Sequence, residues 1–273
     1  MVQFHHSLFA LPFALSAMLV AAQGIPRLWT LGWIVVACVA ARTMAMTYNR
    51  IADRDVDALN PRTSSRALPA GQVSLGFAWG FAIASAAVFI LSAAMLNRLC
   101  LVLSPVALAV LLGYSHWKRF ARGSHLILGA ALGIAPIGSW IAVLGTFSDT
   151  PLWLAAGVMF WTAGFDIIYA CLDVDFDRKQ GLHSLPARIG IARALWRSAG
   201  MHILALVCFA IFAWRSGLGL FGWSGIVLSV IILFFEHRIV SPRDLSRVGP
   251  AFFTFNAVVS VVFFLACALD ILI

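Results

Sequence analysis

Acidic residues are rare in this 273-residue chain, and seven of the eleven lie in two short clusters. The first cluster contains Asp53, Asp55 and Asp57, and the second contains Asp166, Asp173, Asp175 and Asp177. The surrounding sequence is apolar, with 62% hydrophobic and only 11% charged residues. Carboxylate oxygens are the ligands that a hard cation such as Mg²⁺ prefers. Because charges are costly in or beside a bilayer, we interpret the two clusters as a functional site.

The second cluster repeats the spacing of the first. Asn49, Asp53 and Asp57 have counterparts 120 positions later (173 − 53 and 177 − 57, for example), which are Tyr169, Asp173 and Asp177. A Leu-Pro-Ala run follows each cluster, at 68–70 and at 185–187. We therefore predict a parallel internal duplication, with pseudo-repeats at about 1–122 and 123–273 and a site between them.

The phase of a helix predicts which side chains of each cluster act together. If the helix before the first cluster continues through it, Asn49, Asp53 and Asp57 share one face within an arc of about 80°. In the second cluster, Tyr169, Asp173 and Asp177 share one helix face by the same spacing. Asp55 and Asp175 point away from these faces, and we expect them to be solvated or paired with arginine. Two carboxylate faces directed at each other repel strongly unless cations lie between them. With arginines nearby, this predicts a diphosphate held through Mg²⁺.

Membrane-spanning helices must position these clusters, because the apolar segments are too many and too long for a soluble core; mean hydropathy is +0.95. We predict an all-α polytopic membrane protein with about nine transmembrane helices around a central cavity, forming a single domain over residues 1–273. The predicted segments are 7–23, 28–48, 75–96, 98–115, 125–146, 151–172, 196–214, 217–235 and 250–270.

Basic residues follow the even-numbered segments, and this placement predicts the orientation of the chain. The net charge of +8 does not indicate nucleic acid, because the charges gather at 50–66, 118–122, 178–193 and 238–247. By the positive-inside rule, these connections face the cytoplasm, where they can also meet anionic lipid. We expect an integral protein of the plasma (inner) membrane, with its N-terminus inside, its C-terminus outside and its active site toward the cytoplasm.

Two further residues have a functional and an ordinary interpretation. Arg42 lies about two helical turns before Asn49 and shares its face, so its planar fork would suit the carboxylate of an aromatic acid. Alternatively, it extends to the membrane surface as a lone charge. Tyr169 is either an interfacial aromatic or a ring that stabilises an allylic cation. Ordinary loop or terminal charges are expected at the remaining acidic positions, Asp149, Glu236, Asp244 and Asp270.

Over essentially its whole length, the chain resembles the UbiA superfamily of integral-membrane prenyltransferases. Members carry Asn-x-x-x-Asp-x-x-x-Asp after the second helix and Asp-x-x-x-Asp, often preceded by Tyr, after the sixth. Here these motifs are Asn49, Asp53 and Asp57, and Tyr169, Asp173 and Asp177. Many members have Asp where this chain has Arg50. That arginine and the runs 49–55 and 60–71 resemble the 4-hydroxybenzoate polyprenyltransferase-like branch.

The resemblance implies an Mg²⁺-dependent transfer of a polyprenyl group from its diphosphate to a hydroxylated aromatic acid in quinone biosynthesis. The acceptor is 4-hydroxybenzoate, for ubiquinone, or 1,4-dihydroxy-6-naphthoate, for menaquinone. Mg²⁺ would be bound by Asp53, Asp57, Asp173 and Asp177 with help from Asn49, and Tyr169 would join the four aspartates in catalysis. The diphosphate would be held by Lys118 and Arg119, joined from the capping loops by Arg62, Arg66 and Arg178.

Two other functions use similar features. A membrane transporter with a cation-binding carboxylate site also has internal repeats and intramembrane carboxylates. Its carboxylates would be expected near the middle of the membrane, whereas these lie at helix ends. A phosphotransferase acting on CDP-alcohols has an Asp-Gly pair in its motif, and neither cluster contains one.

Overall fold

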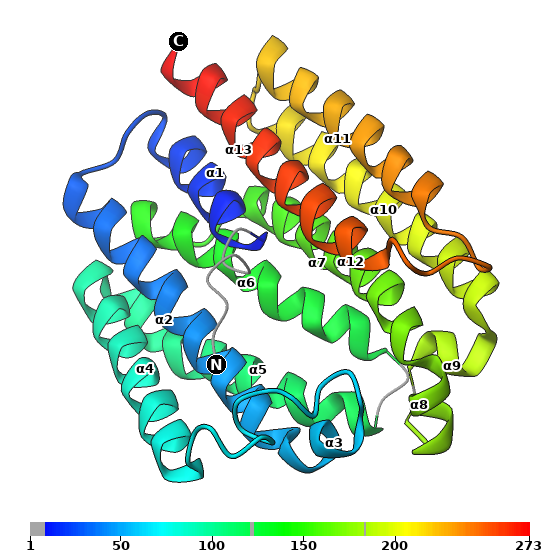
Figure 1. Ribbon diagram of the computed structural model, residues 1–273. Coiled ribbons are helices and arrows are strands. Elements are labelled where there is room, and N and C mark those ends of the chain that lie inside the picture. Colours follow the sequence, from blue (N-terminus) through cyan, green and yellow to red (C-terminus); the bar gives the residue numbers. More distant parts are fainter. Residues whose placement is uncertain (1–8, 121–122, 183) are drawn as a thin grey trace.

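The computed structural model describes residues 9–120, 123–182 and 184–273, and the side chains of 117–120, 250 and 251 lie outside that description. Its elements are helical, as predicted (Figure 1). The elements are α1 (Leu11–Ala22), α2 (Leu28–Ala52), α3 (Arg54–Leu59), α4 (Leu75–Leu96), α5 (Arg98–Phe120), α6 (Ser124–Leu144), α7 (Thr150–Ala170), η2 (Cys171–Asp173), α8 (Val174–Lys179), α9 (Leu185–Ile189), α10 (Ile191–Arg215), α11 (Leu220–Ile239), α12 (Val248–Pro250), η3 (Ala251–Phe255) and α13 (Asn256–Leu272).

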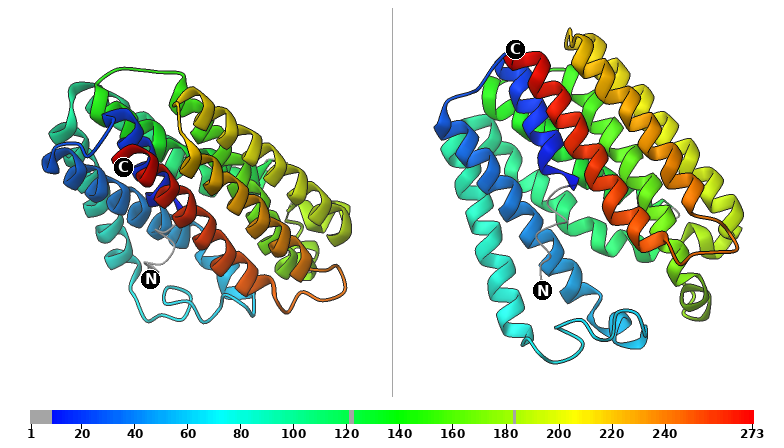
Figure 2. Two further views of the ribbon diagram at one scale, coloured as in Figure 1. Left: turned by 90° about the horizontal axis from the view of Figure 1, so that it is seen from above. Right: turned by 45° about the horizontal axis from the view of Figure 1, so that its top comes forward.

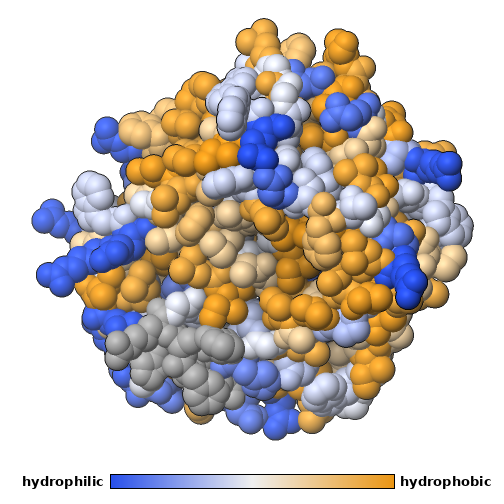
Figure 3. Space-filling view, turned by 180° about the vertical axis from the view of Figure 1, so that it is seen from behind, coloured by the Kyte–Doolittle hydropathy of each residue, from blue (hydrophilic) through white to orange (hydrophobic). Residues whose placement is uncertain are grey.

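Eight helices in the described part of the chain are long and apolar enough to cross a membrane. The first predicted segment, 7–23, contains a shorter helix than expected, because α1 has twelve residues and a length of only about 18 Å. Many large apolar side chains on the long helices face outward, among them Ile83, Val207 and Phe235. Hydrophobic residues cover much of the face seen in Figure 3, as a lipid-facing surface requires.

Helix α6 lies near the centre of the bundle and packs on α1, α5 and α7, and α7 packs in turn on α10. Two glycines allow the close approach of α6 to α7. A Cβ atom on Gly129 would lie 2.1 Å from the carbonyl oxygen of Met159, and one on Gly133 would lie 2.8 Å from that of Ala155. Such small residues let membrane helices approach closely, where packing supplies the attraction.

The second half of the chain also contains a buried polar contact between α11 and α13. Asn256 Nδ2 donates a hydrogen bond of 2.8 Å to Glu236 Oε1, and both side chains are fully buried. The expectation that Glu236 is an ordinary terminal charge is therefore wrong. The helix pair encloses it because α11 packs along α13 over much of its length.

Both acidic clusters lie at the same end of the bundle, where α3 and α8 follow α2 and α7 (Figures 1 and 2). The expectation of two continuous helix faces is wrong, however. Helix α2 ends at Ala52, and α3 starts at Arg54 after Asp53, whose φ and ψ are −94° and 2°. Asp173 lies at the matching break before α8, with φ −106° and ψ 8°. These values fall in the sparsely populated bridge region, where many active-site residues lie.

Candidate functional site

The two helix breaks turn the last aspartate of each cluster inward. Asp57 and Asp177 lie in the first turns of α3 and α8, where the positive end of a helix favours a carboxylate, and they are 7% and 8% exposed. Asp53 is buried as well, at 6%. As expected, Asp55 and Asp175 are exposed. A six-residue helix after a bridge-region aspartate thus occurs once in each half of the chain.

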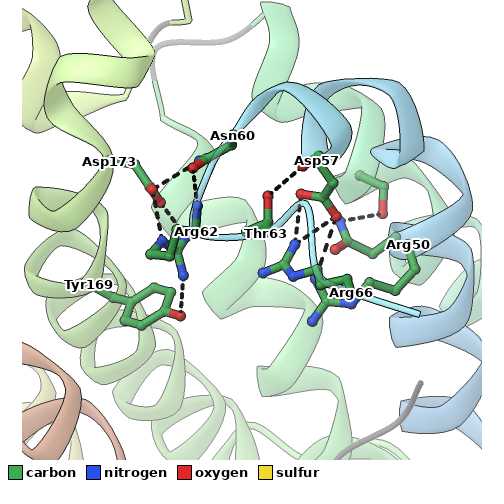
Figure 4. Close-up of polar contacts among 10 residues, drawn as sticks. Arg50, Asp57, Asn60, Arg62, Thr63, Arg66, Tyr169 and Asp173 are labelled. Carbon is green, nitrogen blue, oxygen red and sulfur yellow. Dashed lines mark hydrogen bonds and ion pairs between the residues drawn. The ribbon is translucent and has the colours of Figure 1, made fainter. Parts of the chain in front are cut away.

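The loop between α3 and α4, residues 60–74, connects the two clusters. It begins with turns closed by its own backbone, with Thr63 and Ser64 donating N–H bonds to the Asn60 carbonyl oxygen. Asn60 Nδ2 donates to Asp173 Oδ1 at 3.1 Å, so the loop of the first cluster reaches the second. On its other side, Thr63 Oγ1 donates to the carbonyl oxygen of Asp57 at 3.0 Å. In Figure 4 this loop runs between the two aspartates.

Arg62, on this loop, binds the second cluster. Its Nε donates to Asp173 Oδ1 at 2.8 Å, its Nη2 donates to Asp173 Oδ2, and its Nη1 donates to the Tyr169 hydroxyl at 2.6 Å. The guanidinium carbon also lies 4.9 Å from the centre of the Tyr169 ring. Partial burial acts to lower the pKa of Arg62, but the hydrogen bond and negative charge of Asp173 outweigh it, so the pKa is raised.

Arg66, four residues later, binds the first cluster in a similar way. Its Nη1 lies 2.7 Å from both Oδ1 and Oδ2 of Asp57. Arg50, at the end of α2, lies farther away, with Nη1 3.9 Å from Asp57 Oδ2. Figure 4 shows Arg50 and Arg66 beside Asp57, and Arg62 beside Asp173. Guanidinium groups therefore contribute positive charge at both clusters, in addition to the metal ions that the sequence predicts there.

The donor set nevertheless suits magnesium. Its side-chain ligands are all oxygens, and three of the four candidate aspartates are at most 8% exposed. Within the described residues, no three Asp, Glu, His or Cys side chains are grouped so that they could hold one ion, so the expected convergence of four carboxylates is not seen. Magnesium typically uses one or two carboxylates together with substrate phosphates. One or two aspartates from each half fit that pattern.

An apolar cavity of about 190 Å³ lies among α2, α4, α5 and α6. Its polar lining includes Arg42, Tyr114 and Ser139. Arg42 Nε is buried and has no hydrogen-bond partner among the described residues. Because a buried donor without a partner is costly, an anionic group entering the cavity would gain a charge-assisted hydrogen bond there. Arg42 therefore lines the cavity, as its functional interpretation requires, and its role in binding an aromatic acid stays a prediction.

The remaining predicted site residues are Asn49, Arg178, Lys118 and Arg119. Asn49 Nδ2 donates to Ser115 Oγ at 3.4 Å. Arg178 Nε donates to the carbonyl oxygen of Ala187 at 3.1 Å, which directs this nitrogen to α9. Lys118 and Arg119 belong to the last turn of α5, and their side chains lie outside the described part of the structure.

Sequence reasoning missed two contributions to the site. Asn60 bridges the clusters, and its place directly before Pro61 and Arg62 was the available signal. The second is a 2.6 Å contact between His125 Nδ1 and Asp166 Oδ2, which joins the start of α6 to α7. His125 Nε2 also accepts a hydrogen bond of 3.5 Å from the backbone N–H of Leu185, the first residue of α9. No spacing in the sequence indicates this contact.

Comparison with known proteins identifies relatives along the whole chain. The profile of the UbiA prenyltransferase family matches residues 10–266. The 4-hydroxybenzoate octaprenyltransferase of Shewanella woodyi is 30% identical over 243 residues, which are 89% of this chain and 84% of that protein. The 4-hydroxybenzoate solanesyltransferase of Synechocystis is 35% identical over 171 residues, or 63% of this chain and 59% of that one.

Solved structures with the same fold include two archaeal proteins. A UbiA homolog from Aeropyrum pernix, solved in its apo form, superposes with a TM-score of 0.90 at 36% identity over the full length of both chains. A UbiA homolog from Archaeoglobus fulgidus, solved with GPP and Mg²⁺ bound, superposes with a TM-score of 0.67 at 21% identity and covers 97% of this chain and 98% of that one. At 21% identity, the similarity to the Archaeoglobus fulgidus protein shows a shared fold and nothing more.

Proposed function

This chain belongs to the UbiA prenyltransferase family, and from that premise we propose that it transfers a polyprenyl group from its diphosphate to an aromatic acid in ubiquinone biosynthesis. Relatives named 4-hydroxybenzoate octaprenyltransferase and solanesyltransferase support 4-hydroxybenzoate as the acceptor. The observation that carries the proposal is the pair of acidic clusters joined by Arg62 and Asn60, beside a cavity that contains the unpaired Nε of Arg42.

The donor end of the reaction belongs to the two clusters. Magnesium, when bound, supplies positive charge against the diphosphate leaving group. Asp53, Asp57, Asp173 and Asp177, with Asn49, are the residues that would hold it. Arg62 and Arg66 are placed to donate to phosphate oxygens, since both lie on the loop between the clusters. We assign Lys118, Arg119 and Arg178 to the same anion on the basis of family resemblance and charge.

The acceptor end belongs to the cavity. Arg42 binds the carboxylate of the aromatic acid, and the apolar lining excludes water from the allylic cation formed when the carbon–oxygen bond to the diphosphate breaks. The ring of Tyr169 stabilises that cation through its electron-rich face. The new bond forms between the allylic carbon and a ring carbon of the acceptor, and the ring then loses one proton.

The orientation in the membrane follows from the charges. The end of the bundle that carries α3 and α8 also carries Arg50, Arg54, Arg62, Arg66 and Arg178. We therefore assign this end to the cytoplasm, with the N-terminus inside and the C-terminus outside. The charged diphosphate group of the donor and a water-soluble aromatic acid would reach the site from that side.

The test uses purified protein in lipid nanodiscs with Mg²⁺ and a polyprenyl diphosphate. Pyrophosphate release should require an aromatic acid and should be faster with 4-hydroxybenzoate than with 1,4-dihydroxy-6-naphthoate. Faster release with 1,4-dihydroxy-6-naphthoate would instead assign the enzyme to menaquinone synthesis. Equal release with and without any aromatic acid would refute the aromatic transfer.

A further inference from the structure

The carboxylate oxygens that a metal ion would use are already engaged by arginine. Asp173 Oδ1 accepts from Arg62 Nε at 2.8 Å, and its Oδ2 accepts from Arg62 Nη2. Both oxygens of Asp57 lie 2.7 Å from Arg66 Nη1. A guanidinium and a divalent ion therefore compete for the same lone pairs at each aspartate.

These ion pairs differ from ordinary surface pairs. The side chains of Asp173 and Asp57 are 16% and 10% exposed, whereas Asp55, which pairs with Arg54 in the same region, is 86% exposed. Attraction between charges is screened less strongly when the pair is partly withdrawn from water. An ion that displaces Arg62 or Arg66 without offering it a new partner would therefore break a charge-assisted pair at a largely buried carboxylate.

The two arginines are also presented together. Arg62 and Arg66 are four residues apart on the loop 60–74, and backbone hydrogen bonds join Thr63 to Asn60 and Arg66 to Thr63. Their guanidinium groups point to opposite sides of this loop, one toward each cluster (Figure 4). The same short loop thus supplies one arginine to each cluster.

We propose that Arg62 and Arg66 are resident counter-cations of the two clusters, which release the aspartates only when a diphosphate arrives together with its divalent ion. The diphosphate gives each guanidinium new oxygens to bind, and planar guanidinium groups match phosphate geometry well. The exchange keeps every charge paired, because each aspartate passes from arginine to metal while each arginine passes from aspartate to phosphate. This inference rests on the proposed function of the site and adds an order of binding to it.

The experiment measures Mn²⁺ binding by the electron paramagnetic resonance signal of the free ion, using full-length protein in nanodiscs of uncharged lipid. Wild type should bind Mn²⁺ weakly on its own. With inorganic pyrophosphate it should bind at least roughly tenfold more tightly, a coupling of ordinary size, once the Mn²⁺ that pyrophosphate binds in a protein-free titration is subtracted. Arg62→Gln should tighten binding of Mn²⁺ alone by about tenfold, the change expected from removing one charge-assisted pair. The same variant should lose most of the gain from pyrophosphate.

Three further variants make the result specific. Arg62→Lys keeps the charge and should bind Mn²⁺ alone nearly as weakly as wild type. Arg54→Gln removes an exposed arginine of the same region and should leave both affinities unchanged. Arg66→Gln repeats the comparison at Asp57 and takes the place of Arg62→Gln if that variant does not fold, as judged by its thermal unfolding midpoint.

Unchanged or weaker binding of Mn²⁺ alone in folded Arg62→Gln or Arg66→Gln would overturn the proposal. An equal increase in Mn²⁺ affinity in Arg54→Gln would also overturn it, because the effect would then reflect the total charge of the region. The titrations contain no prenyl chain and no aromatic acid and measure no transfer. An unexpected acceptor would therefore refute the proposed function without altering this result.

Discussion

The candidate site is built from a few charged side chains, and the role of each depends on how deeply it is buried and what it contacts. Asp53 and Asp55 are two positions apart, yet one is buried at a helix break and the other is exposed. Arg42 and Arg54 differ in the same way, since one lines an apolar cavity and the other pairs with a surface carboxylate. Comparing a substitution at a buried residue with the same substitution at an exposed neighbour therefore distinguishes a role in the site from an effect of net charge.

Asp53→Asn should reduce prenyl transfer by roughly 100-fold or more, since it removes a carboxylate that would hold the metal ion whose positive charge stabilises the leaving group in the transition state. The protein should still fold, because the size of the side chain hardly changes. Asp55→Asn, which alters an exposed carboxylate, should retain near-normal turnover in the same assay. Near-normal turnover in Asp53→Asn would mean that the first cluster does not take part in the reaction.

Arg42→Lys should weaken binding of the aromatic acid more than binding of the prenyl diphosphate. Lysine keeps the charge but loses the planar fork that matches a carboxylate. The acceptor KM should rise roughly 10-fold, as expected for the loss of about 1.5–3 kcal/mol in one charge-assisted hydrogen bond. The donor KM should hardly change. An equal rise for both substrates would assign Arg42 to the diphosphate or to the fold.

At the scale of helices, close packing and buried polar contacts hold the scaffold on which the site is built. Gly129 lets α6 approach α7, and these two helices carry His125 and Asp166, whose contact lies at the edge of the second cluster. The buried pair of Glu236 and Asn256 links α11 to α13. Both features act through contacts between helices and not through helix propensity.

Gly129→Ala should lower the thermal unfolding midpoint, because the new Cβ would lie 2.1 Å from the carbonyl oxygen of Met159. Overpacking of this kind typically costs about 1–3 kcal/mol. Gly138→Ala is the matched control in the same helix, because a Cβ there meets nothing within 4 Å and alanine favours the helix. Equal midpoints for the two variants would show that α6 and α7 can separate without loss.

Asn256→Leu should destabilise the protein by roughly 1–3 kcal/mol, since it leaves the buried Glu236 carboxyl without its donor. The double variant Glu236→Leu with Asn256→Leu should recover part of that loss, because replacing both partners by apolar groups removes the unpaired group. Thermal unfolding in detergent measures both effects. A double variant less stable than Asn256→Leu would show that Glu236 has another essential contact.

At the scale of the whole molecule, the bundle brings two acidic clusters from distant parts of the chain to one end (Figure 1). The bridge-region aspartates and the six-residue helices after them occur in both halves. This similarity supports the predicted parallel duplication, which stays a prediction. Two clusters of like charge at one end explain why the molecule needs arginines, metal ions or both between them.

Removal of divalent ions should abolish transfer, because the negative charge developing on the diphosphate would then lack compensation. Activity should be lost after dialysis against EDTA and restored by Mg²⁺ or Mn²⁺. Bound donor should be retained less well by the chelated protein, as measured by equilibrium dialysis with labelled prenyl diphosphate. Full transfer after thorough chelation would contradict a metal-dependent mechanism.

The amino-acid sequence was sufficient to predict the helical membrane fold, which the structure confirms, and to nominate two acidic clusters that the structure brings to one end of the bundle. These properties follow from local information, namely hydropathy, spacing and the order of segments. The contact of Arg62 with Asp173 could be found only in the folded structure, because these residues are 111 positions apart and their contact depends on how the two halves pack. The tertiary structure also decided the helix breaks at Asp53 and Asp173. A regular helical phase cannot predict them, since a break depends on the backbone conformation of one residue and on the contacts that hold it.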